Sequence, residues 1–158
     1  MADILVLYYS RTGSTKKIAE ELSGLLDADL EEVIDLKKRN GFTGFMRAGM
    51  DALLKRHTSI NKISSRLGSY KLVVIGTPVW AGTMAPAIRR VLNDFSRVIK
   101  KAAFFSTQAS SRKQNVFLHM RDFIEPIATL KVTSRELKTD LYKPKLRKFV
   151  EKLKSELK

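Results

Sequence analysis

Residues 10–15, a run of hydroxyl side chains around one glycine, constrain the fold most because they separate two segments of different periodicity. Residues 4–9 form a continuous apolar and aromatic stretch, which is typical of a buried strand. In residues 15–22, Ile18, Ala19 and Leu22 fall on one side of a helix. The sequence therefore predicts a strand that passes through a short polar loop directly into a helix.

A loop at this position favours phosphate binding. The first backbone N–H groups of a helix have no partner within it, and the helix dipole is positive there. Ser and Thr hydroxyls add further donors, and Gly13 lets the backbone approach closely. The alternative is an ordinary helix cap, in which Ser14 or Thr12 caps the helix and nothing binds. The segment alone leaves both interpretations open.

Composition limits the chemistry that the chain can perform. The 158 residues contain no cysteine, which excludes thiolate nucleophiles, disulfides and iron–sulfur clusters. His57 and His119 are lone imidazoles without a ligand pattern around them, so we expect no metal site and treat both as structural. No signal peptide or membrane span is recognised, and we expect a cytoplasmic protein. Redox chemistry, if present, must come from a bound organic cofactor.

The net charge of +14 is distributed unevenly along the chain. Residues 1–36 carry three basic and eight acidic groups, which leaves +19 for residues 37–158. Such a field attracts acidic proteins, anionic membrane surfaces or nucleic acid. The alternative is a lysine-rich surface that only keeps the protein in solution.

Strand and helix patterns alternate from end to end, with no repeat or low-complexity linker. Apolar runs predict parallel strands, and amphipathic spacing predicts the helices that cover both faces of their sheet. We expect one domain over residues 1–158. The expected strands span residues 4–9, 29–34, 71–75, 102–106 and 127–132, and the expected helices span residues 15–27, 42–56, 86–100, 112–123 and 143–157.

Three polar segments, at residues 10–15, 76–82 and 107–111, follow the ends of predicted strands. With these segments in this order, nearly the whole chain resembles the flavodoxin family. The resemblance implies an α/β flavodoxin-like fold, a doubly wound five-stranded parallel sheet in the order 2-1-3-4-5 with helices on both faces. It also implies that FMN binds where the strand order reverses.

Carried over position by position, the resemblance assigns cofactor-binding residues and no catalytic residue. The phosphate loop is matched by Ser10, Arg11, Thr12, Gly13, Ser14 and Thr15, with Arg11 pointing outward. The loop beside the flavin ring is matched by Thr77, Pro78, Val79, Trp80, Ala81 and Gly82, and the loop at its pyrimidine edge by Thr107, Gln108 and Ala109.

Aromatic residues decide how much of the flavin is covered. The resemblance places Trp80, the only tryptophan, against the ring face, where it can help to set the redox potential. The alternative is a core aromatic beneath the loop. The third segment lacks the glycine and aromatic residue common in the family, which favours an open outer face. Phe42 or Phe45 could cover that face, or both could pack inside the helix over residues 42–56.

Three functions remain open at this level. The resemblance implies electron transfer through bound FMN, and the basic charge then calls for an acidic redox partner. The alternative is an FMN-dependent oxidoreductase, similar to a NAD(P)H:quinone reductase or protoporphyrinogen oxidase, with a small flat substrate on the exposed flavin face and peripheral contact with an anionic membrane. A flavin-free module that binds nucleic acid is disfavoured, because no nucleic-acid-reading motif is present.

Overall fold

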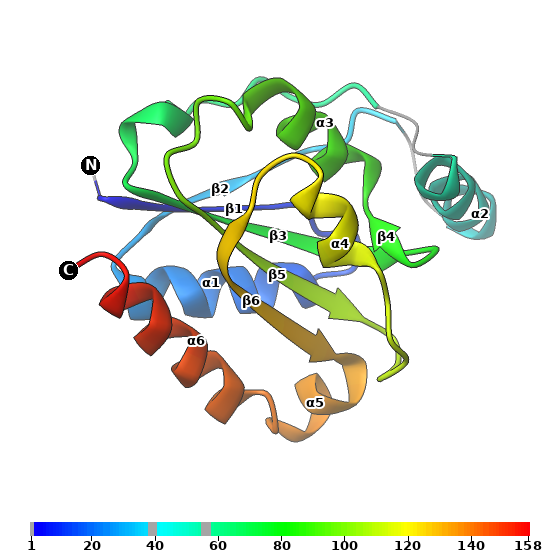
Figure 1. Ribbon diagram of the computed structural model, residues 1–158. Helices are drawn as coiled ribbons and strands as arrows, with labels where there is room; N and C mark the ends of the chain where they lie inside the picture. Colours follow the sequence, from blue (N-terminus) through cyan, green and yellow to red (C-terminus); the bar gives the residue numbers. More distant parts are fainter. Residues whose placement is uncertain (1, 38–40, 55–57) are drawn as a thin grey trace.

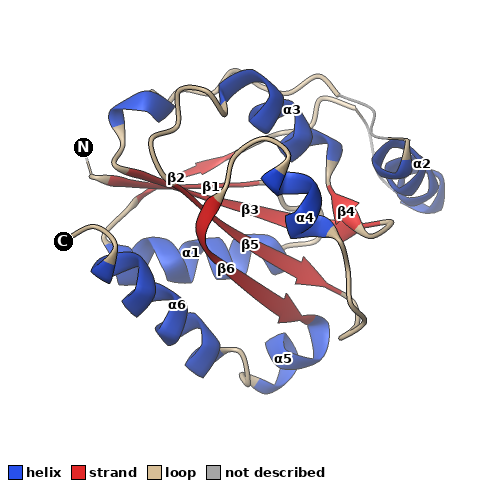
Figure 2. Ribbon diagram, in the orientation of Figure 1, coloured by secondary structure: helices blue, strands red, loops and turns tan. Residues whose placement is uncertain are grey.

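A computed structural model describes residues 2–37, 41–54 and 58–158, which fold around a six-stranded sheet (Figures 1 and 2). In helix α2 the side chains of residues 42, 45, 48, 52 and 53 are not described. The strands are β1 (Ile4–Tyr8), β2 (Asp29–Glu32), β3 (Leu72–Trp80), β4 (Thr83–Met84), β5 (Ala102–Gln108) and β6 (Pro126–Thr133). The helices are α1 (Ser14–Leu26), α2 (Gly41–Leu53), α3 (Pro86–Phe95), α4 (Val116–Arg121), α5 (Ser134–Thr139) and α6 (Lys143–Ser155), with a 3-10 turn at Leu67–Ser69.

The strand order is β2-β1-β3-β5-β6, and all of these neighbours pair in parallel. This corrects the expected five strands in the order 2-1-3-4-5. The difference is β4, a two-residue strand that pairs antiparallel with β3 and lies between the segment 76–82 and the helix expected from Pro86, where no element is expected. Two residues are too few to carry a periodic signal, so its existence depends on the turn that precedes it.

Alternating side chains of the strands build two hydrophobic cores, one on each face of the sheet. On one face Leu5 and Leu7 of β1 pack with Ile88 of α3 and Met120 of α4. On the opposite face Val6 belongs to the cluster that contains buried residues of α1 and α6. Figure 1 shows the same layers, with α1 and α6 on one side of the sheet and α3 and α4 on the other.

Two strands extend further than their apolar runs. The β3 strand continues through the segment 76–80 and β5 continues to Gln108, so residues expected in loops are strand residues. The β1 strand pairs with β3 only as far as Gly76. Beyond that point β3 pairs with β5 in parallel on one side, and Pro78, opposite Thr107, is tolerated because β1 no longer needs its missing N–H.

Helix ends also differ from the expected ones. The α3 helix begins at Pro86 as expected but ends at Phe95, and α4 covers only Val116–Arg121 of the expected residues 112–123. The α5 helix was missed. It begins with a capping box in which the Thr133 hydroxyl accepts from the Glu136 N–H and the Glu136 carboxylate accepts from the Thr133 N–H. Over the described residues, no helix has the length and apolar character that a bilayer crossing requires.

Candidate functional site

The loops expected to bind a ligand meet at the carboxyl-terminal edge of the sheet. Strand β1 lies between β2 and β3. The chain therefore adds β2 on one side of β1 and the later strands on the other, and the strand order reverses at β1. A crevice forms at such a reversal, outside the carboxyl ends of the strands. The segment after β1, the β3–β4 hairpin and the end of β5 lie at this end of the sheet (Figure 1), and residues from all three line one cavity.

The segment after β1 is shaped by Gly13. This residue has φ 98° and ψ −11°, occupies the N-cap of α1, and makes no side-chain cap bond. Its own N–H donates to the Ser10 hydroxyl over 3.1 Å. The first backbone bond within the helix is the one that the Lys17 N–H donates to the Gly13 carbonyl, at 3.0 Å. The N–H groups of residues 14–16 therefore have no partner inside the helix and can meet an anion.

A hydroxyl pair connects the first segment to the end of β5. The Oγ1 atoms of Thr15 and Thr107 are 2.7 Å apart, and both side chains are buried. The two residues are 92 positions apart in the sequence. Their contact fixes the start of α1 against the third ligand segment, so the two ends of the crevice keep a defined separation.

The β3–β4 hairpin carries the tryptophan. Ala81 and Gly82 form its two-residue turn between the paired residues Trp80 and Thr83, with φ angles of 48° and 78°. Positive φ at both central positions is the signature of the type I′ turn, which matches the twist of a hairpin. The Trp80 ring meets the Tyr9 ring edge to face, with centroids 5.4 Å apart. Trp80 is only half-buried, so one part of the indole packs and another stays accessible.

Buried polar groups form hydrogen bonds that stabilise the β3–β4 hairpin. The Thr77 hydroxyl accepts from the Ala85 N–H over 3.0 Å. The Thr83 hydroxyl accepts from Nη2 of the buried Arg89 over 3.1 Å and lies 2.7 Å from Nδ1 of His119. Burial lowers the pKa of the Arg89 guanidinium. The contact of His119 agrees with a structural role, whereas His57 lies outside the described residues.

Gln108 organises the third segment. Its Nε2 donates to the carbonyls of Ser110 and Arg112, at 2.5 and 3.0 Å, which folds the following loop back on the strand. Its Oε1 is buried and has no hydrogen-bond partner among the described residues. A buried acceptor without a donor is costly, so this oxygen marks a place where a ligand N–H would be favourable.

One cavity collects most of the predicted residues. It has a volume of about 180 Å³ and is lined by Arg11, Thr12, Ser14, Thr15, Pro78, Val79, Trp80, Thr107, Gln108, Ala109 and Ser134. We call it the strand-end cleft. Ser10, Gly13, Thr77, Ala81 and Gly82 do not line it, and they shape the segments that do. Ser134 was missed because it begins α5, and the motif Thr133-Ser134-Arg135-Glu136 was the signal that could have revealed it.

The strand-end cleft fits the groups of FMN. Unpartnered helix N–H groups and the hydroxyls of Thr12, Ser14 and Thr15 suit a phosphate, and the half-buried indole of Trp80 suits a flat ring. The orphaned Gln108 oxygen suits an N–H of the pyrimidine. The side chains of Phe42 and Phe45, expected as alternative ring covers, are among the α2 side chains that are not described.

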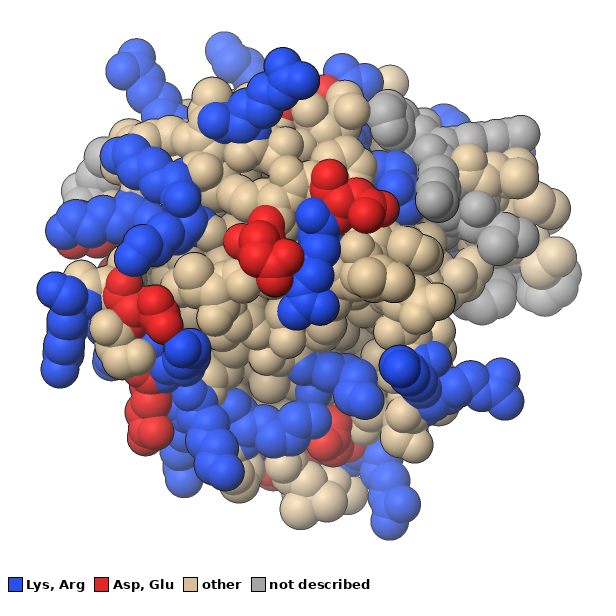
Figure 3. Space-filling model, in the orientation of Figure 1, with Lys and Arg blue, Asp and Glu red and all other residues tan. Residues whose placement is uncertain are grey.

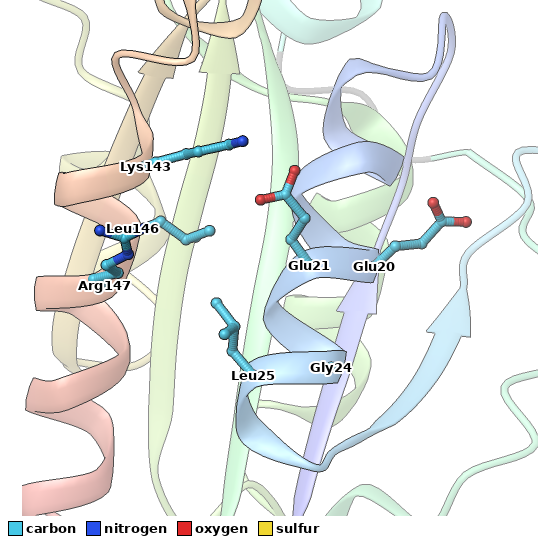
Figure 4. Close-up of a pocket in the computed structure, with 7 residues that line it drawn as sticks. All are labelled: Glu20, Glu21, Gly24, Leu25, Lys143, Leu146 and Arg147. Carbon is cyan, nitrogen blue, oxygen red and sulfur yellow. The ribbon is translucent and has the colours of Figure 1, made fainter.

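A second cavity, between α1 and α6, is of a different kind (Figure 4). It has a volume of about 410 Å³ and its walls carry Glu20, Glu21, Gly24, Leu25, Lys143, Leu146 and Arg147. In Figure 4 the carboxylates come from α1 and the cations from α6. None of these residues lies in the strand-end segments. Within the described ranges, no group of three or more His, Asp or Glu side chains is placed to hold a metal ion.

Comparison with known proteins gives the family. The sequence model described as NADPH-dependent FMN reductase matches residues 2–132. The chain belongs to this family. FMN is therefore the cofactor, and the FMN reductase family places the protein among flavodoxin-like FMN-binding oxidoreductases. No curated protein matches the sequence.

Solved structures similar to this FMN reductase family member are flavoproteins and flavodoxins. The Lactobacillus acidophilus NCFM flavoprotein in complex with FMN has 24% identity and a TM-score of 0.68, covering 86% of this chain and 96% of that one. The apo-form of the flavoprotein from that organism has 27% identity and a TM-score of 0.59, covering 87% and 97%. A flavodoxin from the domain Archaea has 13% identity and a TM-score of 0.57, covering 96% and 98%.

Proposed function

We propose that the protein is an FMN-dependent oxidoreductase in which reduced nicotinamide donates electrons and a small flat acceptor removes them. The observation that carries this proposal is that the third segment, residues 107–111, has no aromatic side chain to cover the flavin ring. Ala109, Ser110 and Ser111 are exposed, and among the residues that the structure describes, Trp80 is the one aromatic side chain that lines the strand-end cleft. One ring face is then available to a substrate.

The phosphate end supplies binding and orientation. In this proposal the N–H groups of residues 14–16 and the hydroxyls of Thr12, Ser14 and Thr15 surround the phosphate oxygens. Hydrogen bonds to a charged group contribute about 1.5–3 kcal/mol each, so a few of them anchor the cofactor. Arg11 is exposed at the rim, where its charge adds a favourable field.

The ring end determines the chemistry. Bound FMN supplies hydride and electron transfer, and the protein positions the ring and sets the electrostatics around it. Pro78, Val79 and Trp80 border one side of the ring in this proposal, and Gln108 accepts a hydrogen bond from its pyrimidine N–H. Because Tyr9 packs against the Trp80 ring, the indole is held in one orientation.

Basic side chains beside the uncovered face of the flavin ring suit an anionic dinucleotide. Arg112 and Lys113 are exposed, and Gln108 binds the Arg112 carbonyl, which ties this pair to the strand-end cleft. A nicotinamide dinucleotide with an additional phosphate then gains charge-assisted contacts. This favours NADPH over NADH as the electron donor, in agreement with the description of the family.

Anaerobic stopped-flow reduction tests the proposal. The FMN-loaded protein is mixed with NADPH or NADH, and the loss of the oxidised-flavin absorbance is followed. We expect rapid reduction with a preference for NADPH, and the variant Arg112→Ala/Lys113→Ala lowers the NADPH affinity about tenfold. The matched control Arg147→Ala/Lys148→Ala removes two exposed cations from α6 and leaves that affinity unchanged.

A protein electron carrier is the second candidate, and the basic surface favours it. Figure 3 shows more Lys and Arg than Asp and Glu on the visible face, with the basic side chains mainly around its margin. Such a surface would dock an acidic redox protein. A carrier would be reduced slowly by both nucleotides and would take up electrons in two separate one-electron steps during a potentiometric titration. That result contradicts the oxidoreductase proposal.

A further inference from the structure

Helix α2 exposes an apolar row at the same end of the molecule as the strand-end cleft. Met46, Met50 and Leu54 are 56%, 51% and 51% exposed, respectively. They are four residues apart, so they lie along one face of the helix, which Leu54 extends by the bond of its N–H to the Met50 carbonyl. Gly44 and Asp51, on another face, are buried. The row is therefore the outward face of a helix that is already packed.

Positive charge accompanies this row. Arg47 is exposed on α2 one residue from Met46, and Lys37 pairs with the buried Asp51 at 3.6 Å. In the sequence, residues 37–56 contain six basic residues and one acidic residue. The one acid is thus turned inward, and the exposed apolar row lies in a basic segment.

We propose that the outward face of α2, formed by Met46, Arg47, Met50 and Leu54, binds the surface of an anionic lipid bilayer. An amphipathic helix of this kind lies in the membrane interface, with apolar side chains among the acyl chains and cations at the headgroups. Unbranched methionine side chains adapt well to a fluid phase. The three side chains of the row are apolar, and the basic residues around them complement acidic headgroups.

Helix α2 lies beside the hairpin that borders the strand-end cleft. The helix contacts β3 and β4, the strands of the hairpin that carries Trp80 (Figure 1). A bilayer against α2 would lie next to the strand-end cleft. If the protein has the proposed function, its substrate would then be a flat acceptor dissolved in the membrane, and this inference rests on that function. Vesicle binding itself does not depend on flavin chemistry.

Vesicle sedimentation of the FMN-loaded full chain tests the proposal. We expect the protein to sediment with vesicles of phosphatidylserine and phosphatidylcholine and to remain in solution with phosphatidylcholine alone. The variant Met46→Ser/Met50→Ser weakens binding at least about tenfold because two apolar anchors are lost. The variant Arg47→Gln weakens it about fivefold. The matched control Leu118→Ser/Leu141→Ser changes two exposed leucines, one on α4 and one in the turn between α5 and α6, and leaves binding unchanged.

Three results would overturn the proposal. The first is no sedimentation with the anionic vesicles, and the second is equal binding by the α2 variant and the leucine control. The third is a loss of FMN affinity or of self-association in Met46→Ser/Met50→Ser without a change in vesicle binding, which would assign the face to the cofactor or to a second copy. NADPH oxidation, measured without vesicles, tests the proposed function separately.

Discussion

The hydroxyl of Thr15 is important in two ways, because it contacts another hydroxyl and belongs to a residue of the strand-end cleft. It lies 2.7 Å from the Thr107 hydroxyl and also lines the strand-end cleft. Because a hydroxyl is both donor and acceptor, Thr15 can hold Thr107 and still contribute to the field around a phosphate. Neither partner could be paired from the sequence, since nothing in a local pattern reports a contact across 92 positions.

The variant Thr15→Val keeps the shape of the side chain and removes the hydroxyl. We expect its FMN dissociation constant to rise at least about tenfold, since a hydrogen bond to a charged group is worth about 1.5–3 kcal/mol. Titration of the protein with FMN measures this. Thr43→Val, which changes an exposed threonine of α2, is the control and retains the affinity. Equal affinities for both variants would remove Thr15 from the cofactor site.

Ala81 is strained in a way that a substitution can relieve. Its φ of 48° belongs to the left-handed region, which asparagine tolerates better than alanine. We expect Ala81→Asn to raise the free energy of unfolding by about 0.5–1 kcal/mol, since Asn-Gly is the preferred type I′ turn. Urea denaturation measures the change. A decrease in stability would show that the turn has another conformation.

At the scale of elements, α5 depends on a carboxylate. Glu136 accepts from the Thr133 N–H at 2.8 Å and from Nζ of Lys145 at 2.9 Å. Burial alone would raise the pKa of Glu136, but the bonds from Lys145 and Thr133 outweigh burial and lower it. A carboxylate whose pKa is lowered by folding stabilises the protein above its unfolded pKa, and this stabilisation disappears as the pH falls through the folded value.

We therefore expect Glu136→Gln to be less stable than the parent at about pH 7 and to approach it below about pH 4, the range of an unfolded glutamate. Urea unfolding at several pH values provides the comparison. The control is Glu125→Gln, because Glu125 is 74% exposed in its pair with Arg121 and contributes little. A stability gap for Glu136→Gln that is independent of pH would contradict the assigned role of the charge.

Elements with strong periodicity could be predicted from the sequence. The apolar run of β1 predicts a strand and the amphipathic spacing in α1 predicts a helix. The polar segment between them is then predicted as a loop. The extension of β3 could not be predicted, because Gly76 and Pro78 are strand breakers in isolation. They are tolerated here by the position of β3 between β1 and β5, which is a tertiary property.

The candidate site was predictable in outline and not in detail. Strand ends placed Thr12, Trp80 and Gln108 at one edge of a parallel sheet. Which residues face the cavity depends on the hairpin turn and on α5, so Ala81 was expected there and Ser134 was not. These distinctions arise from backbone dihedrals and capping bonds that a pattern of residue types does not encode.

At the scale of the whole molecule, the strand-end cleft and the outward face of α2 lie at one end, and the sheet behind them is covered on both faces (Figure 1). The two buried cores make this end a rigid platform, since all side chains of β1 are buried. In the account proposed here, the chemistry depends on the loops and the docking on α2, and both can change without altering the core.

Tryptophan fluorescence during titration with FMN and with riboflavin tests the central claim most directly. Trp80 is the only tryptophan of the chain, so its signal reports the strand-end cleft alone. We predict saturable quenching by one equivalent of FMN and at least about a hundredfold weaker binding of riboflavin, which lacks the phosphate that we propose residues 10–15 bind. No quenching by FMN, or equal affinity for the two flavins, would contradict the account.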